Sequence, residues 1–184
     1  LKHQSSNNFI QLNLDIVIEK LRPILEDPKI IKIGQNIKYD AHIFLNNGIS
    51  LKGIDEDTML MSYILESNQS HGMDKLSKRY LGHDCISYES LVGKGVKQIT
   101  FDQVYIEDAA PYAAEDADVT LQLFQHLHKL LKENKELQKV YKEIEIPSMQ
   151  ALIKVERNGV LIDSKILQKQ SHEIGEKLLN LEKE

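Results

Sequence analysis

The sequence is poor in the residues that cross-link small secreted proteins. Its 184 residues include a single cysteine, Cys85, so no internal disulfide can form and a cytoplasmic location is expected. One cysteine and seven scattered histidines also argue against a structural zinc site of the usual four-ligand kind. No apolar run approaches the about 20 residues that cross a bilayer, and no signal-peptide pattern opens the sequence. We therefore expect a globular protein without a membrane segment.

The sequence also lacks an excess of positive charge. It has 23 basic and 28 acidic side chains, which gives a net charge of −5. Overall charge therefore does not attract nucleic acid to this chain. A nucleic-acid enzyme of this composition needs a local basic groove, or metal ions, to hold phosphates near its carboxylates.

The spacing of apolar residues predicts helices and strands in alternation. Helices are expected over residues 14–25, 36–45, 58–65, 75–81, 111–131, 142–157 and 164–184, and strands over residues 30–33, 49–54 and 160–162. Pro111 suits the first position of its helix, Asp74 is expected to cap the helix that ends at Gly82, and Pro147 is expected to break or kink its helix. Residues 1–12 are expected to be irregular, and residues 83–100 are expected to be rich in loops with a basic tip at residues 94–97. This order of elements predicts an α/β fold.

Two aspartates fall on the apolar faces of predicted helices. If Asp116 is placed at 0° and each residue turns by about 100°, Leu123 and Leu127 lie within about 40° of it. Asp40 likewise shares a helix face with Ile43. An unpaired carboxylate in such surroundings costs several kcal/mol or takes up a proton, so something must compensate each of these charges.

Two explanations fit each aspartate taken alone. Each could form an internal salt bridge, or could lie at a helix edge where its carboxylate reaches water. The pair together favours a shared divalent-cation site, because each aspartate has a polar side chain one turn earlier, Asn36 before Asp40 and Tyr112 before Asp116. Mg²⁺ and Mn²⁺ prefer such oxygen ligands.

Several motifs resemble those of one known family, the family A DNA polymerases typified by bacterial DNA polymerase I. Residues 32–40 (KIGQNIKYD) resemble the second motif of its proofreading exonuclease domain, and residues 112–120 (YAAEDADVT) resemble the third motif, in the tyrosine form of the DEDD exonucleases. Residues 57–60 and 72–76 match the family between these motifs. Residues 156–163 resemble the junction at which the polymerase domain begins.

The resemblance implies a ribonuclease H-like α/β fold, with the exonuclease domain over residues 1–150 and the start of the polymerase domain over residues 151–184. It also implies two-metal hydrolysis of the 3′-terminal nucleotide of single-stranded DNA, with Mg²⁺ or Mn²⁺ as the cations. By motif match, Asp116 is expected to bind the tighter metal and Asp40 the second one. The Tyr112 hydroxyl is expected to orient the attacking water or the phosphate.

The resemblance further implies three substrate-binding residues. Asn36 and Gln35 fall where the family contacts the terminal nucleotide. Tyr88 falls where the family often carries an aromatic side chain that packs on the single strand, although plain packing explains this tyrosine equally well. Stacking on such a ring stabilises binding by about 1–3 kcal/mol and tolerates any base.

One part of the family pattern is missing from the sequence. The family carries an Asp-x-Glu pair on the first strand of its sheet, and no such pair precedes Asp40, where the acidic residues are Asp15, Glu19, Glu26 and Asp27. The first residue is Leu1 instead of Met. The sequence is thus expected to begin after the first strands, to leave a sheet edge exposed, to bind Mg²⁺ weakly and to have little exonuclease activity on its own.

Two other functions remain open at this point. A ribonuclease D-type RNA exonuclease shares the carboxylate and tyrosine arrangement, although residues 156–163 favour a polymerase. A non-catalytic module could instead bind single strands or brace the polymerase domain. Removal of Asp40 and Asp116 from the intact parent distinguishes the enzyme, which loses activity, from the brace, which does not.

Overall fold

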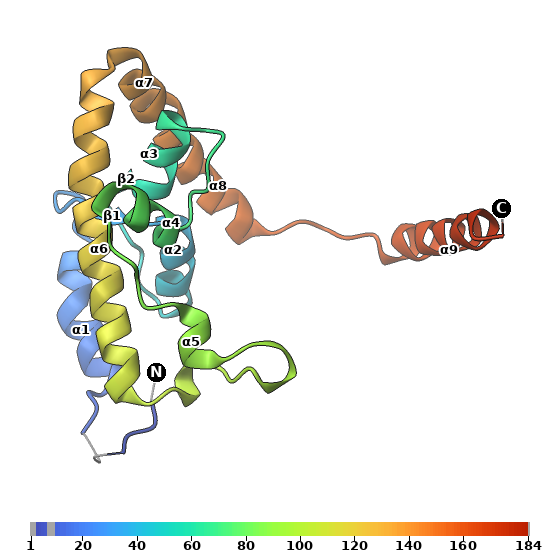
Figure 1. The fold of residues 1–184 in the computed structure, drawn as a ribbon, viewed down its shortest axis with the longest axis horizontal. Helices are drawn as coiled ribbons and strands as arrows, with labels where there is room; N and C mark the ends of the chain where they lie inside the picture. Colours follow the sequence, from blue (N-terminus) through green and yellow to red (C-terminus); the bar gives the residue numbers. More distant parts are fainter. Residues whose placement is uncertain (1–2, 7–9, 184) are drawn as a thin grey trace. The chain divides into compact units, whose positions relative to one another are not determined.

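The computed structural model describes residues 3–6 and 10–183, so the predicted irregular segment 1–12 lies partly outside the described residues. The chain divides into two compact units, Leu1–Ile153 and Lys154–Glu184, which are described separately (Figure 1). None of the helices in the described ranges is long and apolar enough to cross a membrane.

The first unit is built mainly from helices. In chain order its elements are α1 (Leu14–Leu25), β1 (Lys32–Gly34), α2 (Ile37–Asn46), β2 (Ile54–Asp57), α3 (Thr58–Leu65), α4 (Met73–Leu76), the π-helical turn η1 (Ser77–Leu81), α5 (Tyr88–Val92), the 3₁₀ turns η2 (Gly95–Lys97) and η3 (Phe101–Gln103), α6 (Ile106–Glu133), α7 (Lys135–Val140) and the π-helical turn η4 (Tyr141–Glu145). Helix α8 (Ile146–Asn158) runs across the boundary, and α9 (Ser164–Leu181) belongs to the second unit.

Strands β1 and β2 form a parallel two-stranded sheet, with Gly34 opposite Asp57, and α2 makes the crossover between them. The α/β prediction is confirmed, in a helix-rich form. Within the described residues β1 pairs only with β2, which leaves its other edge unpaired. The strand predicted over residues 49–54 is wrong, because β2 begins only at Ile54. Gly53 has a φ of +68°, and a Cβ there would lie 2.4 Å from the Ile30 carbonyl oxygen, so an extended strand cannot continue through it.

Helix α6 is the longest element of the first unit and lies along it (Figure 1). One stripe of α6 is buried, at Val119, Leu123, Leu127 and Leu131, and packs in one core with residues such as Met61. The prediction that this helix begins near Pro111 is wrong, because it begins at Ile106 and Pro111 lies inside it. Proline lacks an N–H group and so removes one backbone hydrogen bond, but the helix continues on both sides.

The start of α6 is joined to the beginning of the chain. The backbone N–H of Ile106 donates to the Gln4 carbonyl oxygen at 2.8 Å, and Gln4 forms an isolated parallel bridge with Tyr105. The His3 ring packs edge-on against Phe101, with centroids 5.2 Å apart. Two residues of the segment predicted to be irregular, His3 and Gln4, therefore pack against η3 and the start of α6.

Three further predictions need correction. Gly72, not Asp74, is the N-cap of α4. The stretch 83–100 is rich in loops, as predicted, and its short helix α5 is capped by the side chain of Ser87. The helix predicted from residue 142 begins earlier, because α7, η4 and α8 follow one another without a gap over residues 135–158. Pro147 lies inside this helical stretch, directly after the π-helical turn η4. Residues 160–162 form no strand and are exposed, since the second unit offers them no described strand to pair with.

Candidate functional site

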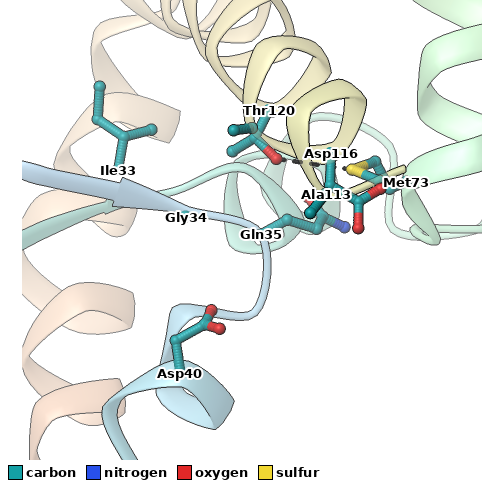
Figure 2. Close-up of a pocket in the computed structure, with 9 residues that line it drawn as sticks. Ile33, Gly34, Gln35, Asp40, Met73, Ala113, Asp116 and Thr120 are labelled. Atoms are coloured by element: carbon teal, nitrogen blue, oxygen red, sulfur yellow. Dashed lines mark hydrogen bonds between the residues drawn. The ribbon is translucent and has the colours of Figure 1, made fainter. Parts of the chain in front are cut away.

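A pocket of about 470 Å³ lies where the end of β1 meets α2, α4 and α6. Its lining consists of Ile33, Gly34, Gln35, Asp40, Met73, Ala113, Asp116, Ala117 and Thr120. The two predicted metal ligands, Asp40 and Asp116, thus come from two helices that are far apart in the sequence to one pocket (Figure 2). Thr120 closes one part of the wall, where its hydroxyl contacts the Met73 sulfur at 3.5 Å.

Asp116 carries an uncompensated polar atom. Its side chain is half-buried, and its Oδ1 atom is buried without a hydrogen-bond partner among the described residues. Burial raises the pKa of this carboxyl group, a hydrogen bond from Tyr112 opposes that shift, and the charges of Glu115 and Asp74 add to it. A buried oxygen without a partner is costly in a native protein, and a cation would supply the missing interaction. The donor set therefore fits a divalent metal.

Asp40 lies in a more open setting than its helical position predicts. Its side chain is exposed, as is Ile43 on the same face of α2, so the prediction that Asp40 is buried among apolar residues is wrong. The reason is that α2 is short and buries only Ile37 and Ala41. The chain around the Asp40 carboxyl group still removes water from it, and this desolvation, followed by the charge of Asp57, raises its pKa.

Asp57 positions the helix that carries Asp40. Its carboxylate accepts hydrogen bonds from the backbone N–H groups of Asn36 at 3.3 Å, Ile37 at 2.8 Å and Leu60 at 3.1 Å. It therefore caps the N-terminal ends of both α2 and α3. Asn36, between β1 and α2, has φ 57° and ψ 47°, a left-handed conformation that costs a non-glycine residue about 1 kcal/mol or more. The aspartate offsets that cost by fixing the Asn36 backbone.

The predicted substrate-binding residues have different amounts of freedom. The Asn36 side chain makes no capping hydrogen bond. In contrast, the Gln35 amide donates from Nε2 to the His71 carbonyl oxygen at 2.8 Å, and its Oε1 accepts from the Thr58 hydroxyl. Gln35 lines the pocket while bracing the walls on either side of it.

Tyr112 and Tyr88 belong to one aromatic cluster, whose third member is Phe101. The ring centroids are 6.2 Å apart for Tyr88 and Tyr112, 5.7 Å for Phe101 and Tyr112, and 5.8 Å for Tyr88 and Phe101. Burial and then the charge of Asp116 raise the pKa of Tyr112 to about 12. Its hydroxyl is therefore protonated throughout the neutral range and can donate a hydrogen bond.

Sequence reasoning missed three residues at this site. The sequence patterns assign Phe101 to no element, include Asp57 only within a matching segment, and predict Asp74 as a helix cap. The charge of Asp74 raises the pKa of both Tyr112 and Asp116, so its carboxylate acts on the site from α4. A signal for Asp57 was present, since an aspartate directly before a predicted helix is a favoured N-cap.

The acidic residues that precede Asp40 do not line the pocket. Asp15 and Glu19 lie on α1. Glu26 is engaged elsewhere, because it pairs with Arg22 at 3.0 Å and accepts from the Ser50 backbone N–H at 2.9 Å. The described pocket thus contains two carboxylates in its lining, Asp40 and Asp116.

The fold agrees with comparisons to known proteins. A family described as 3′-5′ exonuclease matches residues 2–132. The chain is 49% identical over 177 residues to DNA polymerase I of Pseudomonas aeruginosa, a match that covers 95% of this chain and 19% of that protein. It is 39% identical over 175 residues to DNA polymerase I of Rhizobium leguminosarum, covering 95% of this chain and 17% of that protein.

A solved structure has the same fold. It is described as the POL domain of Pol1 from M. smegmatis in complex with DNA primer-template and dNTP, and it matches with a TM-score of 0.70 at 22% identity over 92% of this chain and 26% of that one. The chain spans less than a fifth of the length of the two curated relatives. The match to the exonuclease family covers most of the chain, and the chain therefore belongs to the 3′-5′ exonuclease domain family of bacterial DNA polymerase I.

Proposed function

We propose that this chain contributes the catalytic pocket of a proofreading exonuclease, which hydrolyses the 3′-terminal nucleotide of single-stranded DNA. The observation that carries the proposal is the placement of Asp40 and Asp116 in one pocket, with one Asp116 oxygen buried and unpartnered among the described residues. The family uses divalent metals. An open pocket of about 470 Å³ also has room for the end of a nucleic-acid strand.

Asp116 and Asp40 would hold two divalent cations, Mg²⁺ or Mn²⁺, with Asp116 as ligand of the tighter one. When bound, the cations activate a water molecule and stabilise the leaving oxygen. The raised pKa values of the two aspartates mean that a cation must displace protons from them more often than from ordinary carboxyl groups, so binding should weaken at acid pH.

Tyr112 would orient the attacking water or the scissile phosphate. With a pKa of about 12 its hydroxyl stays protonated at neutral pH, so it can donate a hydrogen bond but does not act as a base, and one turn of α6 separates it from Asp116. Tyr88, which is 44% exposed, would stack on a base of the incoming strand, with Phe101 behind it in the aromatic cluster. Asn36 and Gln35 would contact the terminal nucleotide.

The second unit, Lys154–Glu184, would be the beginning of a polymerase domain. Its helix α9 has no buried residue, and its apolar side chains are more than half exposed at Ile166, Leu167, Ile174 and Leu178. Such a face needs a partner. The polymerase domain of the same parent protein is the partner that we propose.

The test compares two proteins on a 3′-labelled single-stranded DNA with Mg²⁺ or Mn²⁺. One is the 184-residue chain, and the other, here termed the extended protein, has the family's first strands with their Asp-x-Glu pair joined ahead of Leu1. Activity in the extended protein alone is expected, because the pocket lining provides two carboxylates and the family pattern requires the pair as well.

Other outcomes separate the alternatives. Activity in neither protein would support a non-catalytic brace, and equal activity in both would mean that the carboxylates have been misassigned. Faster degradation of a matched RNA strand than of DNA would favour the ribonuclease D-type alternative. Asp116→Ala in the extended protein is the control for contaminating nucleases.

A further inference from the structure

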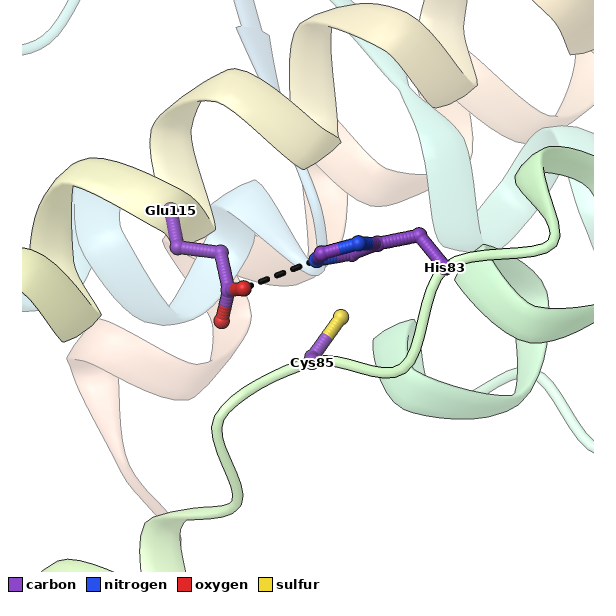
Figure 3. A group of neighbouring side chains, drawn as sticks. All are labelled: His83, Cys85 and Glu115. Atoms are coloured by element: carbon purple, nitrogen blue, oxygen red, sulfur yellow. Dashed lines mark hydrogen bonds and ion pairs between the residues drawn. The ribbon is translucent and has the colours of Figure 1, made fainter.

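A second group of possible metal ligands lies outside the pocket. The ligand atoms of His83, Cys85 and Glu115 all lie within 4.8 Å of one another (Figure 3). His83 and Cys85 come from the segment after η1, and Glu115 comes from α6. The three residues are 32 positions apart at most and share no motif, so sequence spacing could not have indicated the group.

We propose that His83, Cys85 and Glu115 form a binding site for Zn²⁺ that fastens the segment between η1 and α5 to helix α6. The ligand set is one imidazole nitrogen, one sulfur and one carboxylate oxygen. This mixed set is characteristic of zinc, whereas Mg²⁺ prefers oxygen ligands alone. The site therefore selects a different metal from the all-carboxylate pocket.

The existing contacts bring the ligands together. The His83 Nε2 atom lies 2.8 Å from the Glu115 Oε1 atom, and the backbone N–H of Ile86 donates to the other Glu115 oxygen, Oε2, at 2.6 Å. The backbone thus holds Glu115 in place beside Cys85. Ligand atoms around a tetrahedral zinc ion are about 3.5 Å apart, so side-chain rotations suffice to open the His83–Glu115 contact and to bring in the sulfur.

A fourth coordination position is available. A pocket of about 280 Å³ borders the group and is lined by His83, Glu115, Asp118 and Gln122, together with Leu81 and Val119. Water in this pocket could complete a site with three protein ligands. Its polar walls suit a bound water molecule, since such a molecule needs several polar partners.

Zinc at this position would act on the aromatic cluster through the chain. The segment that contains His83 and Cys85 leads directly into α5, whose first residue is Tyr88. Glu115 is the neighbour of Asp116 on α6. A metal that joins these two elements would fix the position of Tyr88 relative to Tyr112 without occupying the carboxylate pocket.

The first experiment is a titration of the 184-residue protein with Co²⁺, which replaces Zn²⁺ and reports thiolate ligation by an ultraviolet charge-transfer band. We expect the band to saturate at one Co²⁺ per chain and to be displaced by Zn²⁺. Cys85→Ser should abolish the band, and His83→Ala should weaken Co²⁺ binding at least about tenfold, as loss of a direct ligand should exceed the loss of an outer partner. His172→Ala removes a histidine of α9 as the matched control and should change nothing, and Asp116→Asn should leave the band intact.

The single cysteine permits a second measurement. Because Cys85 is the only thiol in the chain, a thiol-specific reagent reports on this site alone. Saturating Zn²⁺ should slow its reaction at least about tenfold relative to a chelator, and His83→Ala should remove most of that protection. No charge-transfer band, or a band and a protection that His83→Ala leaves unchanged, would overturn the proposal. The same titration in the extended protein decides the matter if the shorter chain unfolds.

Discussion

The two helices that bring carboxylates to the pocket are held in different ways. Helix α6 has 28 residues, five of which are buried, at Ala109, Val119, Leu123, Leu127 and Leu131. Helix α2 has 10 residues and buries only Ile37 and Ala41. Asp116 is thus anchored by an apolar core, whereas Asp40 depends on the polar contacts of Asp57 with the first turn of its helix. A single pocket combines one carboxylate on a rigidly packed helix with one on a helix that is tethered at its first turn.

The largest difference between the two helices should appear when the better-anchored carboxylate, that of Asp116, is removed. In the extended protein, Asp116→Ala is expected to lower the rate of exonuclease hydrolysis by roughly 10³-fold, the size of effect seen when a preorganised electrostatic group is lost. Single-turnover degradation of labelled DNA measures this rate. Asp118→Ala is the matched control, since Asp118 lies on the same helix, pairs with Gln122 and is absent from the lining of the larger pocket. A similar loss in both variants would contradict a special role for Asp116.

The packing of α6 can be broken next, without touching the site. Leu127 is fully buried, so Leu127→Ala should lower the free energy of unfolding by about 2–5 kcal/mol through lost contacts and a residual cavity. Denaturant unfolding followed by circular dichroism measures the change. Ile43→Ala on α2 is the comparison, because Ile43 is 46% exposed and its truncation should cost less than about 1 kcal/mol. Equal costs would show that the two helices are anchored alike.

A smaller effect is expected when the contacts of Asp57 with the first turn of α2 are weakened. Asp57→Asn preserves the shape of the side chain but replaces one acceptor oxygen by an NH₂ group, so it loses either the hydrogen bonds from Asn36 and Leu60 or the one from Ile37. We expect a loss of about 1–3 kcal/mol in unfolding free energy, together with weaker activity in the extended protein, because Asp40 loses its fixed position. Asp55→Asn, two residues earlier on β2, is the control. Full activity in the Asp57 variant would mean that α2 needs no tether.

The smallest effect should come from pH. The pKa of Asp116 is raised in the folded protein, mainly by burial, so its contribution to stability is present at pH values below its ordinary pKa of 3.8 and is lost as pH rises through the folded value. We therefore compare the melting temperatures of the Asp116→Asn variant and the unsubstituted chain without metal. The melting temperature of the variant minus that of the unsubstituted chain should increase by a few degrees at most as pH rises from about 4 to about 7. Excess Mg²⁺ should stabilise the natural chain alone. A difference that shrinks with rising pH would contradict this assignment.

The helices with a clear apolar period were predictable from the sequence. The bounds of α1 and α3 agree with the predictions residue for residue, and the apolar stripe through Leu123 and Leu127 placed Asp116 beside the core correctly. The same reasoning failed for Asp40, because the apolar face of a short helix says nothing about whether a neighbour covers it. In α2 the exposed Ile43 shows that part of this face is uncovered.

Other errors came from effects that local sequence does not encode. Pro111 resembles a helix start, yet α6 tolerates it in its interior, where tertiary packing outweighs one missing hydrogen bond. The apolar residues at 160–162 resemble a strand, but strands need partners. The closeness of Phe101 to Tyr88, and of Glu115 to His83 and Cys85, depends on how distant segments fold together. The motifs predict roles for the carboxylates and the tyrosine, but they say nothing of the residues that hold them in place.

The carboxylate of Asp57 has a consequence for motions on the scale of minutes and longer. This carboxylate accepts hydrogen bonds from backbone N–H groups at the start of both α2 and α3. The backbone N–H of Asp57 donates to the buried hydroxyl of Tyr141 at 2.9 Å. Opening either helix end therefore disturbs the other, and both are linked to the turn η4. In native-state hydrogen exchange the amides of Ile37, Asp57 and Leu60 should behave as one cooperative unit with a common opening free energy, although their positions in the chain span 24 residues.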